Sequence, residues 1–517
     1  MVEVINTNIV IVTLVLVTLF SVVWKILNDF WFRPKKLEKF LRSQGFKGNP
    51  YRLFYGDMKD MAAVVQQAHS KPIKHDEYLV PYIIPYHHQM IQKFEKCFIW
   101  YGPYPVLIIT DPKMIKDITY KHTIFQRPTL SPLDRLLVTG LFIKEGDEWA
   151  KRRKIINPAF TLEKLKNMVP SMYVSCRELV DKWETSIQGK ESCEIDVWPD
   201  FANLTADVIS RTAFGSRFEE GRRIFELQRE LFFLIYQCSQ TIYIKGSRFL
   251  PTKRNRRMKG IFRESNAIMR DLIKKREERM KDEENSEDLL GILLESNLKE
   301  IKENGNKKSC GLTTDDVVEE CNLFYFAGQE TTSNLLVWTM IMLGIHRDWQ
   351  EKAREEVSQV FGNNELELEG LHRLKIVTMI LNEVLRIFPP ALNIGRSTHE
   401  TTKLGDIIVP PRTGILVNLP LVHHDPQIWG DDVKEFNPER FSQGVAKATK
   451  KPNSYLPFSM GPRICIGQNF ALNEAKVAFA LILPSFSFEV SPSYEHAPFP
   501  RFTIQPRFGA KMILRKL

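Results

Sequence analysis

The feature that most constrains this chain is a ten-residue loop, FSMGPRICIG at residues 458–467, which holds one cysteine between two glycines. Gly461 and Gly467 have no Cβ, so the backbone on both sides of Cys465 can pass close to a flat ligand. The apolar residues that follow predict a helix over residues 468–483. Cys465 therefore lies just before a helix N-terminus, where the helix dipole lowers the pKa of a thiol. A single thiolate placed in this way is typical of an axial ligand of haem iron.

The neighbours of the cysteine favour the same interpretation. Arg463 offers a planar cation that suits a propionate carboxylate of haem, and Phe458 can cover the sulfur side of the ring. Considered alone, Cys465 is better explained as a buried structural cysteine. The pattern F-x-x-G-x-R-x-C-x-G fixes five positions together, however, and so favours a ligand loop.

Composition places the chain among globular proteins and limits its partners. The chain is 43% hydrophobic and 26% charged, and its 72 basic and 62 acidic residues give a net charge of +10. This basic excess fits an anionic membrane surface or an acidic partner, but it is too diffuse to indicate nucleic acid. The seven cysteines are scattered without a C-x-x-C pair, so neither a zinc site nor a disulfide framework is indicated.

The N-terminus predicts a membrane anchor. Residues 4–24 carry no charge and are long enough to cross a bilayer as a helix. Basic residues follow this segment, which places the remainder of the chain in the cytosol. A cleaved signal peptide is the alternative, but a basic leading region and a cleavage site are missing. We expect an anchor at residues 1–30 and one catalytic domain at residues 31–517.

The domain itself shows no repeat and no low-complexity linker. Most of its segments predict helices, whereas the short apolar runs at residues 106–109 and 407–409 predict strands. The charged segment at residues 281–312 predicts an exposed connection that contains a short helix. The expected class is mainly α with a small β-sheet region.

A second candidate site element lies in the sequence WAKRRK. Trp149 and Arg153 are four residues apart on a predicted helix and therefore share one face. From that face an indole N–H and a guanidinium can both reach a haem propionate. The alternative is an ordinary amphipathic surface helix.

A long helix is predicted from the Thr313 N-cap to about residue 344. The sequence AGQETT at residues 327–332 lies in its middle. Ala327 and Gly328 reduce side-chain bulk, so the helix can open locally and leave room for O2. Glu330 and Thr331 are costly in an apolar helix unless they are used or paired, and proton delivery would use them. A bent helix with a polar kink is the alternative.

Three further charged residues are predicted to have a structural role and not a catalytic one. Glu383 and Arg386 form an E-x-x-R pair before two prolines, and Arg440 lies in the sequence PERF. A bridge from Arg440 to Glu383 would neutralise a costly buried charge, but no spacing in the sequence links the two residues, and the expectation rests on the family resemblance given below. The E-x-x-R spacing is weak evidence alone, because it also occurs at residues 219–222, 220–223 and 351–354.

This ordered set of motifs closely resembles the cytochrome P450 superfamily, and the resemblance covers almost the whole chain. Finer segments resemble plant family 72, in particular its 72A members, among them PKKLE at residues 34–38 and LPTKRN at residues 250–255. The resemblance implies the cytochrome P450 fold with one N-terminal transmembrane helix. It implies a haem b cofactor with Cys465 as the axial iron ligand.

The resemblance also implies roles for individual residues. Trp149, Arg153 and Arg396 would bind the haem propionates together with Arg463. Thr331 and Glu330 would be the catalytic pair, one in oxygen activation and the other in proton relay from solvent. Glu383, Arg386 and Arg440 would be structural, and His423 and His424 would touch nothing catalytic.

The implied activity is a membrane-bound monooxygenase that oxidises a terpenoid, either a triterpenoid, an iridoid monoterpenoid or a gibberellin. O2 would be the co-substrate, and NADPH–cytochrome P450 reductase, with cytochrome b5 as a second donor, would supply electrons. The expected location is the endoplasmic reticulum membrane, with a single pass and a cytosolic catalytic domain. Alternatives are a haem-thiolate isomerase or dehydratase that needs no O2, a herbicide-detoxifying monooxygenase, and a non-catalytic haem or ligand-binding protein.

Substrate choice is expected to depend on variable segments at residues 125–141, 225–248, 391–394 and 498–502. The candidate pocket residues are Ala327, Gly328, Leu392, Ile394 and Arg501. Arg501 would pair with a carboxylate of an acidic substrate, and a surface arginine is the alternative.

Overall fold

The computed structural model describes residues 2–128, 131, 133–215, 218–239, 250–280, 288–303, 305, 310–362 and 365–517. The side chains of residues 2–7, 218–220 and 239 also lie outside this description. Parts of three predicted segments therefore fall outside the described residues: 129–130 and 132 in the first substrate segment, 240–248 in the second, and 281–287, 304 and 306–309 in the charged connection.

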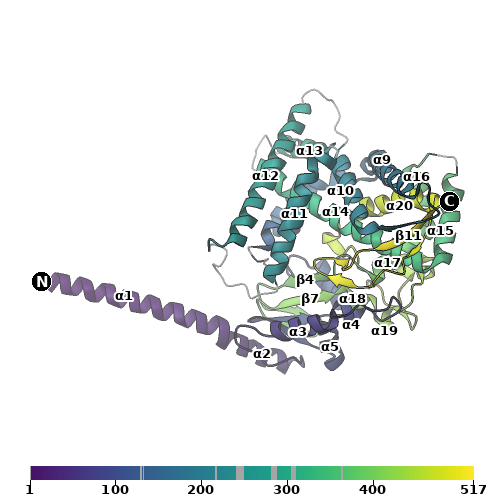
Figure 1. Cartoon of the computed structure of the whole chain (residues 1–517). Helices are drawn as coiled ribbons and strands as arrows, with labels where there is room; N and C mark the ends of the chain where they lie inside the picture. Colours follow the sequence, from purple (N-terminus) through teal and green to yellow (C-terminus); the bar gives the residue numbers. More distant parts are fainter. Residues whose placement is uncertain are drawn as a thin grey trace.

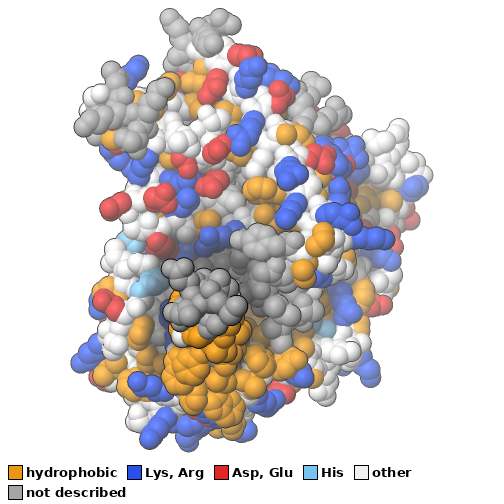
Figure 2. Space-filling view, turned by 90° about the vertical axis from the view of Figure 1, so that its left-hand side faces the viewer, with side chains coloured by type: hydrophobic (Ala, Val, Ile, Leu, Met, Phe, Trp, Pro, Cys, Tyr) orange, Lys and Arg blue, Asp and Glu red, His pale blue; other side chains and the backbone are white. Residues whose placement is uncertain are grey.

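The N-terminal helix α1 (Val2–Leu27) extends away from the body of the molecule (Figure 1). A π-helical turn (Asn28–Phe32) joins it to α2 (Arg33–Ser43), which begins with Pro34 near its first turn. Residues 8–43 contain an 18-residue window of mean hydropathy 2.5, and none of that window is buried. Figure 2 looks at this side of the molecule and shows apolar side chains gathered around the helix, with Lys and Arg on the surrounding surface. Within the described residues, this is the one helix long and apolar enough to span a membrane.

The body is built around α14 (Thr314–Ile345), a long helix that begins with a capping box. The Thr313 hydroxyl accepts from the Asp316 N–H, and the Asp316 carboxylate accepts from the Thr313 N–H, which satisfies two N–H groups at the helix start. The bounds agree with the predicted helix to within one residue. The other long helices are α8 (Gly146–Ile156), α9 (Leu162–Ile187), α10 (Val197–Phe214), α11 (Phe218–Ser239), α12 (Lys253–Arg279), α13 (Leu289–Glu303), α15 (Arg347–Phe361), α17 (Lys375–Ile387) and α20 (Gln468–Ser485).

Further helices, most of them shorter, connect these elements. They are α3 (Met58–Ala68), α4 (Val80–Ile83), α5 (Pro85–Lys93), α6 (Pro112–Tyr120), α7 (Gly140–Ile143), α16 (Leu368–Arg373), α18 (Leu419–His423) and α19 (Pro426–Trp429).

The described residues form four small sheets. Their strands are β1 (Phe98–Tyr101), β2 (Tyr104–Ile108), β3 (Cys193–Asp196), β4 (Asn393–Ser397), β5 (Thr402–Leu404), β6 (Ile407–Val409), β7 (Gly414–Asn418), β8 (Phe486–Val490), β9 (Pro498–Pro500), β10 (Ile504–Pro506) and β11 (Lys511–Lys516). The largest sheet has the order β1-β2-β7-β4, β3-β11-β8 form a second sheet, and β9-β10 and β5-β6 pair separately. The strands predicted at residues 106–109 and 407–409 are confirmed as β2 and β6.

Among the described residues, two large apolar cores and one small cluster around Tyr86 and Ile99 hold the body together. The larger core surrounds α9, α10, α14 and α20, and the smaller core lies against the β1-β2-β7-β4 sheet. Alternate residues of β4 are buried, because successive side chains of a strand point to opposite faces. Ile394 and Arg396 therefore share the buried face of β4.

The prediction for the charged connection needs correction. Its helix α13 is no exposed linker, because Leu290 and Leu293 are each 1% exposed and belong to the main core. Asn297 donates to the Leu312 carbonyl oxygen over 3.0 Å, and this bond ties the helix to the chain that enters α14. The charges that suggested exposure lie mostly outside this apolar stretch.

Candidate active site

The cysteine loop is closed by its own backbone. A short 3₁₀ turn at Gly461–Arg463 is followed by Cys465, whose N–H donates to the Phe458 carbonyl oxygen over 2.9 Å. The Gly467 N–H in turn donates to the Cys465 sulfur. Helix α20 begins directly after Gly467, as predicted, and it continues through Pro484 in its last turn. The loop therefore holds one sulfur at a fixed point in front of a helix.

The pKa of Cys465 differs from the sequence expectation. Its side chain is accessible, yet protein surrounds the loop on its other sides, and this loss of solvent raises the thiol pKa. The Gly467 N–H and the charge of Arg153 oppose the rise without cancelling it. The predicted lowering of the Cys465 pKa is therefore wrong for the protein surroundings alone, because desolvation is the largest contribution. A coordinated metal ion deprotonates a thiol outright.

Gly461 and Gly467 are required for different structural reasons. Gly461 has φ +72°, and a Cβ there would lie 3.0 Å from the Thr119 carbonyl oxygen of α6. Its constraint is thus left-handed backbone and a protein neighbour, not a flat ligand as we expected. Gly467 has φ −89°, and a Cβ there would meet only the Phe160 ring, at 3.9 Å. Gly467 is therefore the glycine whose side faces open space.

A cluster of cations lies next to the loop. The charges of Arg127, Arg396 and Arg463 act on one another, and one carboxylate, Glu145, faces them. Burial, together with the neighbouring positive charges, lowers the pKa of Arg127 to about 9 and that of Arg396 to about 10. Glu145 pairs with Arg463 at 2.7 Å. We call Arg127, Arg396, Arg463 and the adjacent His122 the cation cluster.

The cation cluster has more charge than protein partners. Within the described part of the chain, Nε of Arg127, Nε of Arg396, Nε and Nη1 of Arg463 and Nδ1 of His122 are buried without a hydrogen-bond partner. Three guanidinium groups against one carboxylate leave two positive charges in excess. Buried like charges are costly unless an anion joins them. The two propionate carboxylates of a haem would supply that charge, so these residues fit such a cofactor.

Helix α8 joins the cation cluster to the cysteine loop. The Trp149 ring stacks with His122 at 4.9 Å between centroids, and the Arg463 guanidinium lies 4.7 Å from the Trp149 ring. Arg153, one turn further on, donates to the Ile464 carbonyl oxygen over 3.0 Å. The structure thus brings both predicted α8 residues to the loop, with Arg153 bonded to its backbone.

The neighbour of Arg153 was missed by the sequence analysis. Arg152 is buried and forms ion pairs with Glu320 at 2.6 Å, with Glu319 at 3.1 Å and with Asp316, all three on α14. These contacts fix α8 against the first turns of α14. A basic run next to Trp149 gave no indication of which arginine points inward.

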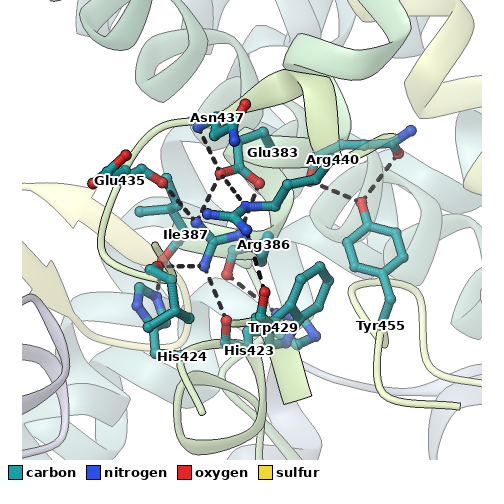
Figure 3. Close-up of polar contacts among 12 residues, drawn as sticks. Glu383, Arg386, Ile387, His423, His424, Trp429, Glu435, Asn437, Arg440 and Tyr455 are labelled. Atoms are coloured by element: carbon teal, nitrogen blue, oxygen red, sulfur yellow. Dashed lines mark hydrogen bonds and ion pairs between the residues drawn. The ribbon is translucent and has the colours of Figure 1, made fainter. Parts of the chain in front are cut away.

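The predicted support triad comes together as a closed network (Figure 3). Glu383 and Arg386 on α17 are fully buried and pair at 2.7 Å, and Arg440 reaches Glu383 at 3.4 Å. Arg386 also donates to three backbone carbonyl oxygens, those of His423, Val433 and Glu435. Arg440 completes the network through an ion pair with Asp432 at 2.7 Å.

His423 and His424 lie at the base of this network and are not arranged as metal ligands. His423 accepts from the Leu456 N–H at Nε2, so its Nδ1–H donates to the Arg386 carbonyl oxygen. His424 contacts the Ile387 carbonyl oxygen. Burial and the charge of Arg386 lower the pKa of both histidines to about 3. No cluster of potential metal ligands occurs among the described residues.

The polar segment of α14 carries an accessible strip. Ala327 is exposed and Thr331 is partly exposed, whereas the residues after Thr331 are buried. The Thr331 hydroxyl donates to the Ala327 carbonyl oxygen over 2.7 Å. The helix is continuous over its whole length, so the predicted local opening is not observed. Gly328 faces α10, where a Cβ would lie 2.9 Å from Ile209, and its small size serves that helix crossing.

Glu330 is enclosed by hydrogen-bond donors. Its Oε1 accepts from Thr503 Oγ1 at 2.6 Å and from Gln505 Nε2 at 2.5 Å, both on or beside β10. Burial raises the pKa of Glu330, and the donors and the positive charge of Arg229 on α11 oppose this rise. Thr503, Gln505 and Arg229 were not predicted, because each lies far from Glu330 in the sequence.

The remaining pocket candidates have mixed positions. Leu392 and Ile394 are both 7% exposed and pack in the apolar cores, and their assignment to a pocket wall stays a prediction. Arg501 is exposed, and its guanidinium lies 5.5 Å from the Tyr236 ring and 5.4 Å from the Phe499 ring. Phe502 next to it contacts Phe232 on α11 at 4.9 Å.

Comparison with known proteins identifies the family. The model of the cytochrome P450 family matches residues 83–509. The chain is 56% identical to cytochrome P450 CYP72A219 of Panax ginseng, with 96% of each chain covered. The chain belongs to the cytochrome P450 family. This cytochrome P450 is also 53% identical to 7-deoxyloganic acid hydroxylase of Catharanthus roseus, again with 96% of each chain covered. Its relatives place it with the 72A members, and it is a cytochrome P450 monooxygenase.

A solved structure confirms the fold. Retinoic acid-bound cyanobacterial CYP120A1 superimposes with a TM-score of 0.72 over 84% of this chain and 94% of that chain, at 24% identity. The mainly helical architecture with small sheets is therefore the cytochrome P450 fold, as the sequence predicted.

Proposed function

We propose that this cytochrome P450 hydroxylates or further oxidises a terpenoid acid, using O2 and electrons that NADPH–cytochrome P450 reductase delivers. The observation that carries the proposal is the 53% identity, over almost the full length, to an enzyme named for the hydroxylation of 7-deoxyloganic acid. The triterpenoid and gibberellin classes stay within the proposal, because the same fold and cofactor serve them. Cytochrome b5 would serve as a second electron donor.

The residues of the cation cluster support this chemistry. Arg396, Arg463 and His122 would hold the haem propionates, Trp149 would position them, and Cys465 would ligate the iron. When bound, the haem supplies the activation of O2, with the thiolate as electron donor. Thr331 and Glu330 lie on one stretch of α14, where a hydroxyl and a carboxyl can bind and move protons. The accessible side of Ala327 leaves space beside them.

The carboxylate preference rests on Arg501. Its guanidinium is exposed and lies over two aromatic rings, and the described residues give it no ion pair. An aromatic wall with one unpaired cation suits an apolar ligand that ends in a carboxylate. Arg501 would therefore orient the acid group while the hydrocarbon part packs against Phe502.

The anchor supports a membrane location. We place α1 across the endoplasmic reticulum membrane, with the body on the cytosolic side and in contact with membrane lipid. The exposed apolar side chains of α1 and the basic residues that follow it support this orientation. The division between anchor and catalytic domain near residue 30 stays a prediction.

Microsomes that contain this chain and a plant reductase test the proposal. A panel of iridoid acids, oxidised triterpenoids and gibberellins should yield an NADPH-dependent product heavier by one oxygen from one class. Product formation without NADPH would instead indicate an isomerase or dehydratase. Absence of product from every class, in microsomes with intact thiolate-ligated haem, would exclude a terpenoid substrate.

Methyl esters of the same acids isolate the contribution of Arg501. We expect Arg501→Ala to raise KM for the acid about tenfold, the loss expected for one charge-assisted hydrogen bond. KM for the ester should change little, because the ester has no charge to pair. An equal effect on acid and ester would contradict the role of Arg501 as a carboxylate partner.

A further inference from the structure

The strand pair β9-β10 holds the one carboxyl group in the polar segment of α14. Glu330 Oε1 accepts from the Thr503 hydroxyl at 2.6 Å and from the Gln505 amide at 2.5 Å. Asn334, one turn along α14, donates to Thr503 Oγ1 at 3.1 Å and lies 3.4 Å from Glu330 Oε1. Asn334, Thr503 and Glu330 therefore form a short chain of donors that ends on one oxygen.

The two oxygens of Glu330 are consequently unequal. The protein hydrogen bonds found in the described part of the chain all reach Oε1, and none reaches Oε2. Donors stabilise the negative end of a carboxyl group, so a proton on this group belongs on the other oxygen. The side chain also keeps partial exposure. Oε2 is thus the atom from which a proton can leave.

The strand pair that holds Glu330 also contacts two helices of the body. Trp338 of α14 donates to the Ile504 carbonyl oxygen at 2.8 Å, which fixes β10 against the helix. At the tip between the two strands, Phe502 contacts Phe232 at 4.9 Å and Phe326 at 6.5 Å between ring centroids. The tip therefore touches α11 and α14, while the base binds the carboxyl group.

Few charged groups lie near Glu330 among the described residues. From α11, Arg229 faces it with a positive charge. From α10, the groups that contact this part of α14 are neutral, since the Thr205 hydroxyl donates to the Gln329 carbonyl oxygen. The acids of α10, Asp200 and Asp207, pair with Lys182 and Arg211 respectively. From the strand pair, the cation Arg501 stacks on Tyr236 and Phe499, and Thr503 and Gln505 are neutral donors.

We propose that Thr503 and Gln505 are positioning residues for Glu330, which hold Oε1 so that Oε2 presents the transferable proton. This inference rests on the proposed function, in which Glu330 is a proton donor for the oxidation. It assigns the base of the β9-β10 pair to proton delivery and its tip to substrate contact. A substrate that displaces Phe502 would then act on Glu330 through the next residue, Thr503.

The test measures pH dependence and not only rate. Removal of a donor to the charged form raises the pKa of a carboxyl group. Glu330 would then stay protonated to higher pH, and the alkaline fall in product formed per NADPH consumed should move up by about one pH unit. We expect this shift in Thr503→Val and in Gln505→Leu. Thr503→Ser, which keeps the hydroxyl, should retain the wild-type midpoint.

Two controls distinguish an effect on the position of Glu330 from a nonspecific disturbance of the fold. Thr339→Val removes a buried hydroxyl on the same helix, whose one hydrogen bond within the described residues goes to the Leu335 carbonyl oxygen. This variant should leave the midpoint unchanged. Infrared titration supplies a readout that does not depend on turnover. The protonated-carboxyl band that Glu330→Gln abolishes should titrate about one pH unit higher in Thr503→Val.

The outcomes distinguish the inference from the function on which it rests. If Glu330→Gln keeps both the wild-type yield of product per NADPH and the fall of that yield at alkaline pH, the proton-donor role and the inference both fail. If Glu330→Gln removes the alkaline fall in yield but Thr503→Val and Gln505→Leu leave the midpoint of that fall unchanged, only the inference is overturned. The reduced carbon monoxide spectrum shows for each variant that the haem site is intact.

Discussion

Two charged regions of this protein are both buried, yet they differ in whether their charges find partners within the chain. In the network of Glu383, Arg386 and Arg440, ion pairs and backbone carbonyl oxygens satisfy the charges from within the chain. In the cation cluster, several buried nitrogens have no partner among the described residues. The first region needs nothing further, whereas the second region needs an anion.

This difference separates structural from ligand-binding residues without reference to motifs. A closed network stabilises the fold only while every member is present, because loss of one partner leaves a buried charge unpaired. An open cluster contributes little to the stability of the protein alone, because its charges repel. Its stabilisation comes on binding. The two regions should therefore respond differently to substitution, in stability for the first and in haem affinity for the second.

The largest effect is expected in the closed network. Glu383→Ala would leave Arg386 buried and unpaired, at a cost of about 3–5 kcal/mol in the free energy of unfolding. Chemical denaturation and the yield of intact haem protein measure this loss. Glu351→Ala is the matched control, because it has the same E-x-x-R spacing on an exposed helix face and should change stability by less than about 0.5 kcal/mol. Equal effects of the two variants would contradict the comparison.

The open cluster should respond in haem affinity instead. Arg396→Met removes one charge-assisted hydrogen bond of about 1.5–3 kcal/mol, which corresponds to a roughly 10- to 100-fold faster loss of haem. The haem-free protein should be as stable as wild type or more so, because repulsion with Arg463 is removed. Transfer of haem to an excess of apomyoglobin measures the first quantity, and unfolding of haem-free protein measures the second.

Arg354→Met serves as the reciprocal control for this variant. Arg354 donates to the Leu483 and Phe486 carbonyl oxygens, so its loss should lower stability without a specific effect on haem transfer. The opposite pattern, with Arg396→Met unstable and its haem retained, would show that the cation cluster is a structural network.

The closed network should also be sensitive to acid through His423. Its folded pKa of about 3 lies below the ordinary value of 6.5, so below pH 6.5 the unfolded chain takes up a proton that the folded protein does not. Stability is therefore complete above pH 6.5 and falls by about 1.4 kcal/mol for each pH unit between 6.5 and 3. Unfolding at pH 7.5 and 5.5 measures the slope. His423→Gln should have a shallower slope, and identical slopes would exclude this contribution.

The smallest effect distinguishes the two loop glycines. Gly461→Ala forces left-handed backbone and a close contact with Thr119, and should cost about 1 kcal/mol in the haem-free protein. Gly467→Ala introduces a Cβ into open space, so the haem-free protein should be unaffected while haem binds less tightly. Thermal unfolding with and without haem makes the comparison. A similar loss of stability in both haem-free variants would argue against a ligand at Gly467.

Local patterns were enough to predict much of the framework. The Thr313 cap fixed the start of α14 because a side-chain oxygen three residues from an acid forms a capping box wherever the helix lies. The apolar run of β2 and the E-x-x-R spacing on α17 are likewise local. The contact between Arg440 and Glu383 could be anticipated only from the family resemblance, since 57 residues separate them.

The parts that sequence analysis missed depend on tertiary packing. His122 and Arg127 meet Arg463 only after α6, α8 and the cysteine loop assemble, and no spacing rule links them. Glu330 finds its donors 173 and 175 residues away. Gly328 was assigned to the pocket because it lies beside Ala327 in sequence, yet neighbours on a helix point in different directions. Desolvation, which raises the pKa of Cys465, also cannot be inferred from a loop motif.

The central claim is that Cys465, beside an open cluster of cations, is the thiolate ligand of a haem. The most direct test is the reduced carbon monoxide spectrum of microsomes that contain wild type, Cys465→Ser or Cys193→Ser, the last being a partly exposed cysteine on β3. We predict the absorbance of thiolate-ligated haem for wild type and for Cys193→Ser, and its absence for Cys465→Ser in folded protein. Retention of that absorbance in Cys465→Ser would contradict the account.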